Sequence, residues 1–144
     1  MEKLILRYNS FVKALQTLEN SVHKLQTKQY NDYAELRDSL IQRFEYSADT
    51  FWKVLKDYLR VILSIEVDIA RPKIVFNECH DAKLISREEL TICIELIEDR
   101  NVTSHGYNEK LAEDISAHIP KYCNLMRTVI KRLQIPSNDS LTIR

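Results

Sequence analysis

The chain has 144 residues, a length typical of one domain with its own hydrophobic core. One glycine and three prolines leave almost no material for the tight turns of β-hairpins, which favours an all-helical fold. Lysine plus arginine and aspartate plus glutamate both count 21, so the formal net charge is zero. This balance argues against a protein that coats nucleic acid regardless of sequence, because such binding needs an excess of basic residues. A small local basic site stays compatible with it.

Cysteine usage and hydropathy exclude further classes. Cys79, Cys93 and Cys123 are odd in number and form no C-x-x-C pair, so we expect buried apolar fillers in a reducing cytoplasm instead of disulfides or a zinc module. The run at residues 78–81 contains ligand-type side chains, but four consecutive helical residues point in different directions. No run of 18 apolar residues and no signal-peptide pattern occurs. We therefore expect a soluble, cytoplasmic protein with no membrane association, metal or cofactor.

Two long amphipathic helices are predicted in the first half of the chain. Apolar residues alternate spacings of four and three from Leu4 to Leu25, which predicts a helix with a narrow apolar seam. A second helix is predicted from about residue 32 to residue 65, with an apolar stripe from Tyr33 to Ile62. It contains no glycine or proline over more than thirty residues. This second helix should be the spine of the fold.

Three shorter or interrupted helices are predicted in the second half. Pro72 suits the first turn of a short helix that runs to about residue 84, and residues 86–89 (Ser-Arg-Glu-Glu) form a capping box that opens the next. That fourth helix should continue until residues 100–106. A fifth should begin near Asn108, and Pro120 should bend it or divide it near Ala117.

These elements predict an antiparallel up-and-down bundle of four to five helices. Residues 1–135 should form one domain, and the polar residues 136–144 should be a frayed tail. The second helix carries interleaved charges that favour a solvated, salt-bridged face: Arg37, Arg43, Glu45, Asp49, Lys53, Lys56, Asp57 and Arg60. On the same helix Trp52 is expected in the core or an interface. His23 and His118 are expected on the surface.

Residues 98–107 are the best candidate for a catalytic or binding site, since Arg100 can bind a phosphate and His105 can transfer a proton. In one ideal helix, however, these two residues point about 140° apart and do not share a face. The side chains of Arg100 and His105 converge only if the helix unwinds near Gly106, or if a second copy of the chain completes the site. Asn101 and His105 do share a face, and Ser104 aligns with Arg100. The alternative is an ordinary helix C-terminus, at which Arg100 and His105 only interact with the last backbone carbonyls and have no further function.

Three segments together resemble a known family: residues 38–46, 51–59 and 98–107. The chain resembles the HEPN domains labelled nucleotidyltransferase substrate-binding proteins, which are relatives of the HepT toxins. The R-x4-H-x-Y pattern formed by Arg100, His105 and Tyr107 is weak alone and specific in combination with the two segments of the second helix. The resemblance covers nearly the whole chain. It implies a dimeric, HEPN-like helical bundle that works beside a separately encoded minimal nucleotidyltransferase.

The resemblance also implies an activity. In HepT-like members, Arg and His form a metal-independent endoribonuclease site across the dimer, here Arg100 and His105 with Asn101 and Ser104 in support. The partner enzyme would neutralise this toxin by adenylylating Tyr107. DNA lacks the 2′-hydroxyl that attacks in this reaction and should be inert. Two alternatives stay open: a non-catalytic subunit that binds a nucleotide or substrate for the partner, and a plain dimeric helical scaffold.

Overall fold

A computed structural model describes residues 1–136, and within this range the chain is helical with no strand. The all-helical prediction is therefore confirmed for the described part. The five helices, in chain order, are α1 (Glu2–Gln26), α2 (Tyr33–Val61), α3 (Pro72–Asp81), α4 (Arg87–Thr103) and α5 (Glu109–Arg132). The predicted tail lies outside the described residues except for Pro136.

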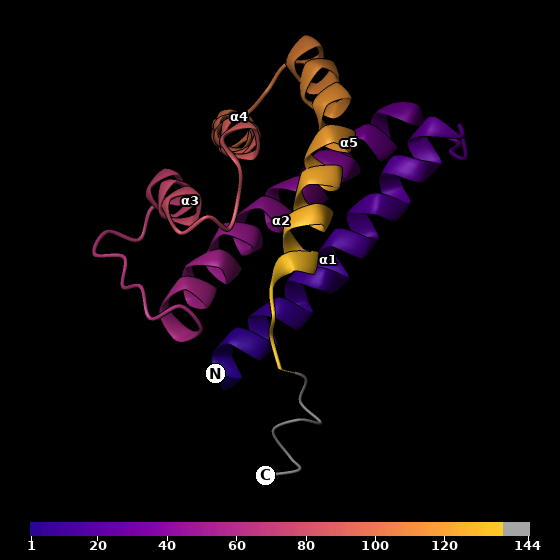
Figure 1. Ribbon diagram of the computed structural model, residues 1–144. Helices are drawn as coiled ribbons and strands as arrows, with labels where there is room; N and C mark the ends of the chain where they lie inside the picture. Colours follow the sequence, from indigo (N-terminus) through magenta and orange to yellow (C-terminus); the bar gives the residue numbers. More distant parts are fainter. Residues whose placement is uncertain (137–144) are drawn as a thin grey trace.

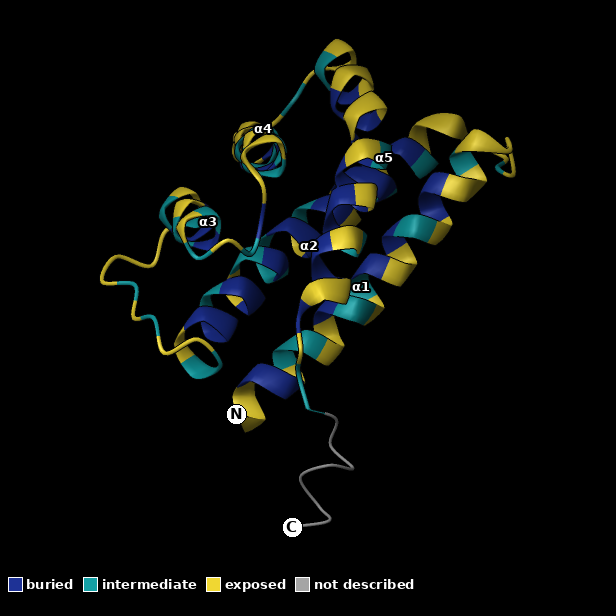
Figure 2. Cartoon of the chain, viewed as in Figure 1, coloured by how far each residue is buried: buried dark blue, intermediate teal, exposed yellow. Residues whose placement is uncertain are grey.

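The two longest helices, α1 and α2, form an antiparallel pair, and α5 crosses over both (Figure 1). Their buried faces turn toward one another (Figure 2), and they supply most of the core. Phe11 of α1, Phe51 of α2 and Phe76 of α3 form a chain of ring contacts, with centroids 5.4 and 6.0 Å apart. Because α2 contacts all four other helices, it is the spine that its uninterrupted sequence predicted.

The shorter helices α3 and α4 lie differently from the long ones. Figure 1 shows both end-on, whereas α1, α2 and α5 extend across the view. The two helices pack against each other and against α2. Helices α3 and α4 therefore do not run up and down alongside α1, α2 and α5 (Figure 1). A ten-residue α3 spans only about 15 Å, so it cannot follow α2 along its length.

Side-chain caps fix the starts of three helices where the sequence predicted them. Asp32 accepts a hydrogen bond from the Glu35 N–H at the start of α2, and Asn108 caps α5 through the Leu111 N–H. Ser86 and Glu89 form the complete capping box of α4, with each side chain bonded to the other's backbone N–H. These bonds satisfy amides that a helix start leaves free.

The ends of the helices were predicted less well. The second helix was expected to reach residue 65, but α2 ends at Val61, and Ser64 follows with a φ of 57°. The third was expected to reach about residue 84, but α3 ends at Asp81, before Lys83 with a φ of 64°. Left-handed residues stop helices, and glycine is the usual signal for them. Here serine and lysine fill these positions, so the sequence carried no such signal.

Pro120 lies inside α5 and does not divide it. Of the two expected outcomes, a bend or a division near Ala117, the division does not occur. A proline removes one backbone hydrogen bond and clashes with the preceding turn, at a cost of about 3 kcal/mol. Flanking side chains that pack into the core, Ile119 and Tyr122 among them, keep the two halves aligned.

The three cysteines are free and buried, in keeping with the expected apolar filling of the core. Among residues 1–136, no helix is both long and apolar enough to cross a bilayer. The same range contains no group of three or more His, Cys, Asp or Glu side chains arranged to hold a metal ion.

Candidate functional site

The candidate site lies where α4 ends and the chain turns into α5. The last turn of α4 tightens, because the N–H groups of Ser104, His105 and Gly106 each bond to the carbonyl three residues earlier. Gly106 then adopts a φ of 85°, a conformation that other residues rarely adopt, and ends the helical path. The unwinding thus begins after His105. Arg100 and His105 both lie on the helical path, and their side chains project from different sides of it.

Arg100 projects toward α2 and is held there by two carboxylates. Its Nε and one terminal nitrogen donate to Asp49 over 3.1 and 3.0 Å, and its other terminal nitrogen lies 3.3 Å from Glu45. The side chain is only 20% exposed. The hydrogen bond to Asp49 raises the pKa of Arg100 above its already high ordinary value, against the opposing effect of burial. The guanidinium is therefore permanently charged and fixed in orientation.

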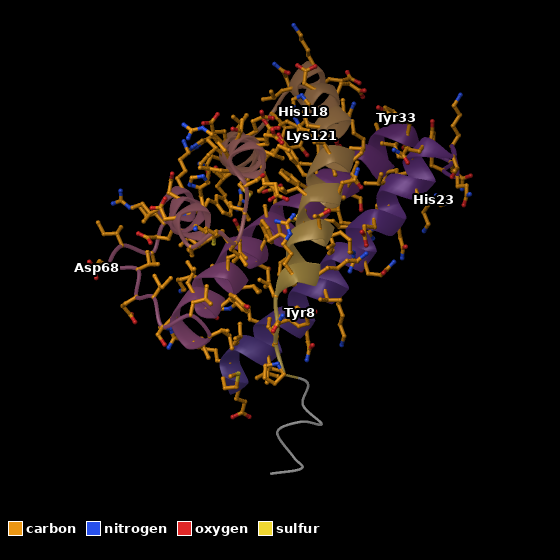
Figure 3. All side chains as sticks on the ribbon, viewed as in Figure 1. Tyr8, His23, Tyr33, Asp68, His118 and Lys121 are labelled. Atoms are coloured by element: carbon orange, nitrogen blue, oxygen red, sulfur yellow. The ribbon has the colours of Figure 1, made fainter. Side chains whose placement is uncertain are left out.

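Asp99, the residue before Arg100, projects to the opposite neighbour, α5. Its carboxylate accepts the Tyr122 hydroxyl over 2.5 Å and lies 2.9 Å from Nδ1 of His118. Figure 3 shows His118 together with Lys121 on the stretch of α5 near α4. Burial and the bond to Asp99 raise the pKa of Tyr122 well above its ordinary value. Two consecutive residues thus pin the end of α4 to α5 and to α2, which fixes the direction in which the candidate segment leaves the bundle.

His105, Asn101 and Ser104 lie on the outer surface of this end. The Ser104 hydroxyl donates to the backbone carbonyl of Asn101 over 2.7 Å, which satisfies one of the last carbonyls of α4. Within residues 1–136 the imidazole of His105 makes no hydrogen bond to another side chain, including that of Asn101. One chain therefore presents His105 to solvent and Arg100 to α2, without direct contact between them.

Tyr107 turns back onto the bundle. Its side chain is half-buried and packs against the hydrophobic core. Burial raises the pKa of Tyr107, and the negative charges of Asp38 and Glu45 raise it further, while Arg37 lowers it. Glu45 thus links the two parts of the motif, because it forms an ion pair with Arg100 and its charge also raises the pKa of the Tyr107 phenol. This packing limits the access of solvent to the phenol, although an adenylylated tyrosine would need to be accessible.

A second polar cluster lies beside Tyr107 and corrects our expectation for Arg37. Arg37 is 6% exposed, and its guanidinium lies 2.8 Å from Glu113 of α5. The Tyr33 hydroxyl donates to the same carboxylate over 2.6 Å. Tyr33 and Arg37 lower the pKa of Glu113 by bonding to its ionised form. Arg37 therefore joins two helices and does not belong to a solvated face.

Sequence reasoning identified Arg100 but missed its partners. Glu45 and Asp49 were attributed to a salt-bridged face within the second helix, whereas they pair with a residue 51 or more positions away. Asp57, which unlike them is buried, also pairs outside the helix, with Arg7 of α1 over 2.7 Å. The sequence did indicate the pairing of Glu45 and Asp49 with one arginine, because two carboxylates four residues apart share one helix face and can hold a single guanidinium.

A family model described as nucleotidyltransferase substrate binding protein like matches residues 6–135. The chain belongs to this family. A crystal structure of a protein from Thermus thermophilus is similar, with 36% sequence identity and a TM-score of 0.76. The match covers 87% of this chain and 99% of that one. No curated protein matches the sequence. The resemblance to nucleotidyltransferase substrate-binding proteins is thereby confirmed, and the matched range spans every motif residue.

Proposed function

We propose that this family member is the helical partner of a separately encoded minimal nucleotidyltransferase and that its Arg100 and His105 cleave RNA without a metal. One observation carries the proposal: an exposed imidazole and a rigidly held guanidinium lie on successive turns at one helix end. These are the two groups that metal-free cleavage of RNA needs, one for proton transfer and one for charge on the phosphate.

The proposed reaction follows from these groups. The ribose 2′-oxygen attacks the adjacent phosphorus, its proton passes to His105, and the bond to the 5′-oxygen breaks. The products are a 2′,3′-cyclic phosphate and a 5′-hydroxyl, which takes up a proton. Arg100 stabilises the charge on the phosphorane oxygens. Ser104 supports the backbone of the site through its bond to the Asn101 carbonyl. Asn101 is assigned to orient the imidazole once RNA is bound, because the two side chains share a helix face but do not bond in the free chain.

Two copies of the chain are needed for this site, since one copy directs Arg100 and His105 to different sides of the α4 end. We propose a homodimer in which the two α4 ends face each other, so that each His105 works with the partner copy's guanidinium. Light scattering at micromolar concentration tests the stoichiometry and should give the mass of a dimer. A monomer would leave the site incomplete and contradict the proposed mechanism.

A second candidate function is a non-catalytic subunit that binds a nucleotide or substrate for the nucleotidyltransferase. The specific observation in its favour is the pairing of Arg100 with Asp49 and Glu45. Two carboxylates around one guanidinium leave a local charge of minus one, which weakens the attraction for an RNA phosphate. With this function, His105 and Tyr107 form a docking surface and no bond in RNA breaks.

Purified protein incubated with RNA and a chelator separates the two functions. We expect cleavage that falls by about 10²-fold or more in both Arg100→Ala and His105→Ala. His23→Ala is the matched control, because His23 is an exposed histidine on α1, outside the motif (Figure 3). Cleavage that survives in His105→Ala would come from a contaminating nuclease. An inactive wild type would favour the binding subunit.

A further inference from the structure

A groove runs between α1 and α2, and none of its residues belongs to the motif. It consists of two adjoining hollows of about 460 and 410 Å³ that share Ser10 and Tyr46. We call it the α1–α2 groove. On α1 its lining spans residues 3 to 17, which corresponds to a length of roughly 21 Å.

The charge of the α1–α2 groove has one sign. Its lining includes five cationic side chains and no carboxylate: Lys3, Arg7, Lys13, Arg43 and Lys53. Arg7 is neutralised by Asp57, and Arg43 donates to the buried hydroxyl of Ser21. Among residues 1–136, Arg43 and the three lysines form no ion pair. Although the net charge of the chain is zero, cations without an ion-pair partner are concentrated along the α1–α2 groove. The groove should therefore attract a polyanion.

The exposed aromatic ring of Tyr46 lies where the two hollows of the α1–α2 groove meet. Tyr46 is 58% exposed and borders both hollows. Proteins that bind single-stranded nucleic acid combine a basic groove along the backbone with aromatic rings on which bases stack. We propose that the α1–α2 groove binds a single strand of nucleic acid, with phosphates on the cations and one base on Tyr46.

Other occupants fit the α1–α2 groove less well. An acidic amphipathic helix would need a row of apolar anchors, but Leu6, Ala14 and Tyr46 are the only apolar or aromatic residues in the lining. A second copy of the chain related by a two-fold axis would bring the same cations face to face, which is unfavourable. An extended strand with regularly spaced negative charges meets neither difficulty.

The position of Tyr46 relates the α1–α2 groove to the candidate site. Tyr46 and Asp49 are three residues apart on α2 and therefore neighbours on the helix surface, and Asp49 holds Arg100. A strand in the groove would pass close to that ion pair. The inference does not require cleavage, because binding depends only on phosphates and bases.

Fluorescence anisotropy with a labelled oligothymidylate of about 12 nucleotides tests this binding. Being DNA, the probe has no 2′-hydroxyl and cannot be cleaved by the proposed mechanism. We expect binding that weakens with salt, with a slope of log K against log salt of about −3 for four phosphate contacts. Lys13→Ala, which removes one of the four contacts, should reduce the steepness by about 0.7. Lys131→Ala, on an exposed residue of α5 outside the groove, is the matched control and should change neither affinity nor slope.

Tyrosine variants test the stacking contact. Tyr46→Ala should weaken binding roughly tenfold, whereas Tyr46→Phe should keep it, because stacking needs the ring and not the hydroxyl. Both variants should fold, since this side chain is mostly solvent-exposed. Circular dichroism checks that they do.

Several outcomes would overturn the inference. They are a wild type that does not bind the probe, Lys13→Ala and Tyr46→Ala variants that both bind as well as wild type, and a probe displaced only by an acidic peptide. A dimer that becomes monomeric in Tyr46→Ala would assign the groove to self-association instead. Failure of the nuclease proposal is distinguishable: the probe would bind through the groove while RNA stays intact. If instead the groove proposal fails and the nuclease proposal holds, the Lys13→Ala and Tyr46→Ala variants should cut RNA as well as wild type does.

Discussion

The Arg100 guanidinium and the Asp49 carboxylate face each other through two parallel hydrogen bonds that join α4 to α2. Glu45, one turn earlier on α2, adds a third contact. Bidentate pairs of this kind fix both position and orientation. The pair therefore orients the guanidinium and also competes with any phosphate that approaches it.

Neutralising Asp49 should separate these two effects. Asp49→Asn keeps a hydrogen-bond acceptor beside Arg100 and removes one negative charge. If RNA binds at Arg100, we expect KM for RNA to fall by about two- to fivefold, as for the loss of a partly exposed ion pair, with kcat little changed. Steady-state kinetics on a labelled RNA gives both constants.

The control for Asp49→Asn is Asp68→Asn, which removes the same charge from the loop between α2 and α3 (Figure 3). It should leave KM unchanged. A rise in KM for Asp49→Asn would mean that orientation of Arg100 matters more than competition by the carboxylate. Equal effects in both variants would indicate a general charge effect and no specific role for the pair.

Local patterns were sufficient to predict the helices, and contacts between helices were not predictable in the same way. The capping box of Ser86 and Glu89 and the cap Asn108 depend on neighbours in the sequence, so they appeared where expected. The partners of Arg100 depend on how α2 is rotated about its axis, which its stripe fixes only approximately. Helix ends without glycine, such as those at Lys28 and Ser64, also carried no local signal.

The ion pair between Glu89 and Arg132 should make stability depend on pH. Arg132 donates two bonds of 2.7 Å to Glu89, and these, with the Ser86 N–H, lower the pKa of that carboxyl despite its burial. A lowered pKa in the folded state stabilises the protein above the unfolded pKa of about 4.3, and this stabilisation is lost as pH falls through the folded pKa. Glu89→Gln keeps the capping box but loses the pair.

We therefore expect Glu89→Gln to lower the free energy of unfolding by about 0.5–1 kcal/mol at neutral pH, since Arg132 is partly exposed. The difference from wild type should begin to shrink as pH falls through the unfolded pKa and should vanish only below the lower pKa of Glu89 in the folded state. Urea unfolding at several pH values measures it. Glu88→Gln, at the exposed neighbouring position, is the control and should have a smaller effect. A difference that stays constant with pH would rule out the charge as its cause.

The three cysteines should resist thiol reagents in the folded protein. Burial raises the pKa of Cys79 and Cys123 to about 12 and that of Cys93 further. Because the thiolate is the reactive form, alkylation by iodoacetamide at about pH 8 should be about 10³-fold slower than in urea. Mass spectrometry over time measures the rates. A thiol that reacts at the unfolded rate in native buffer would identify local opening around it.

Tyr107 should be the point at which the partner enzyme controls the chain. In adenylylation the phenolic oxygen attacks the α-phosphorus of ATP, pyrophosphate leaves, and the phenolic proton passes to a base. Because burial and nearby carboxylates raise the pKa of Tyr107, the nucleotidyltransferase must supply that base. The product carries about one negative charge and a bulky nucleotide just past the end of α4, so it should block RNA by charge and by size.

Tyr107→Phe should retain nuclease activity within about threefold of wild type and escape inactivation by the nucleotidyltransferase and ATP. Intact-mass spectrometry should find an adenylyl group on the wild type and none on this variant. Tyr46→Phe, which removes the hydroxyl of the most exposed tyrosine and leaves Tyr107 in place, is the matched control and should still be labelled. A wild type without added mass, or equal labelling of Tyr107→Phe, would favour the binding subunit, because the phenol would then serve recognition and not control.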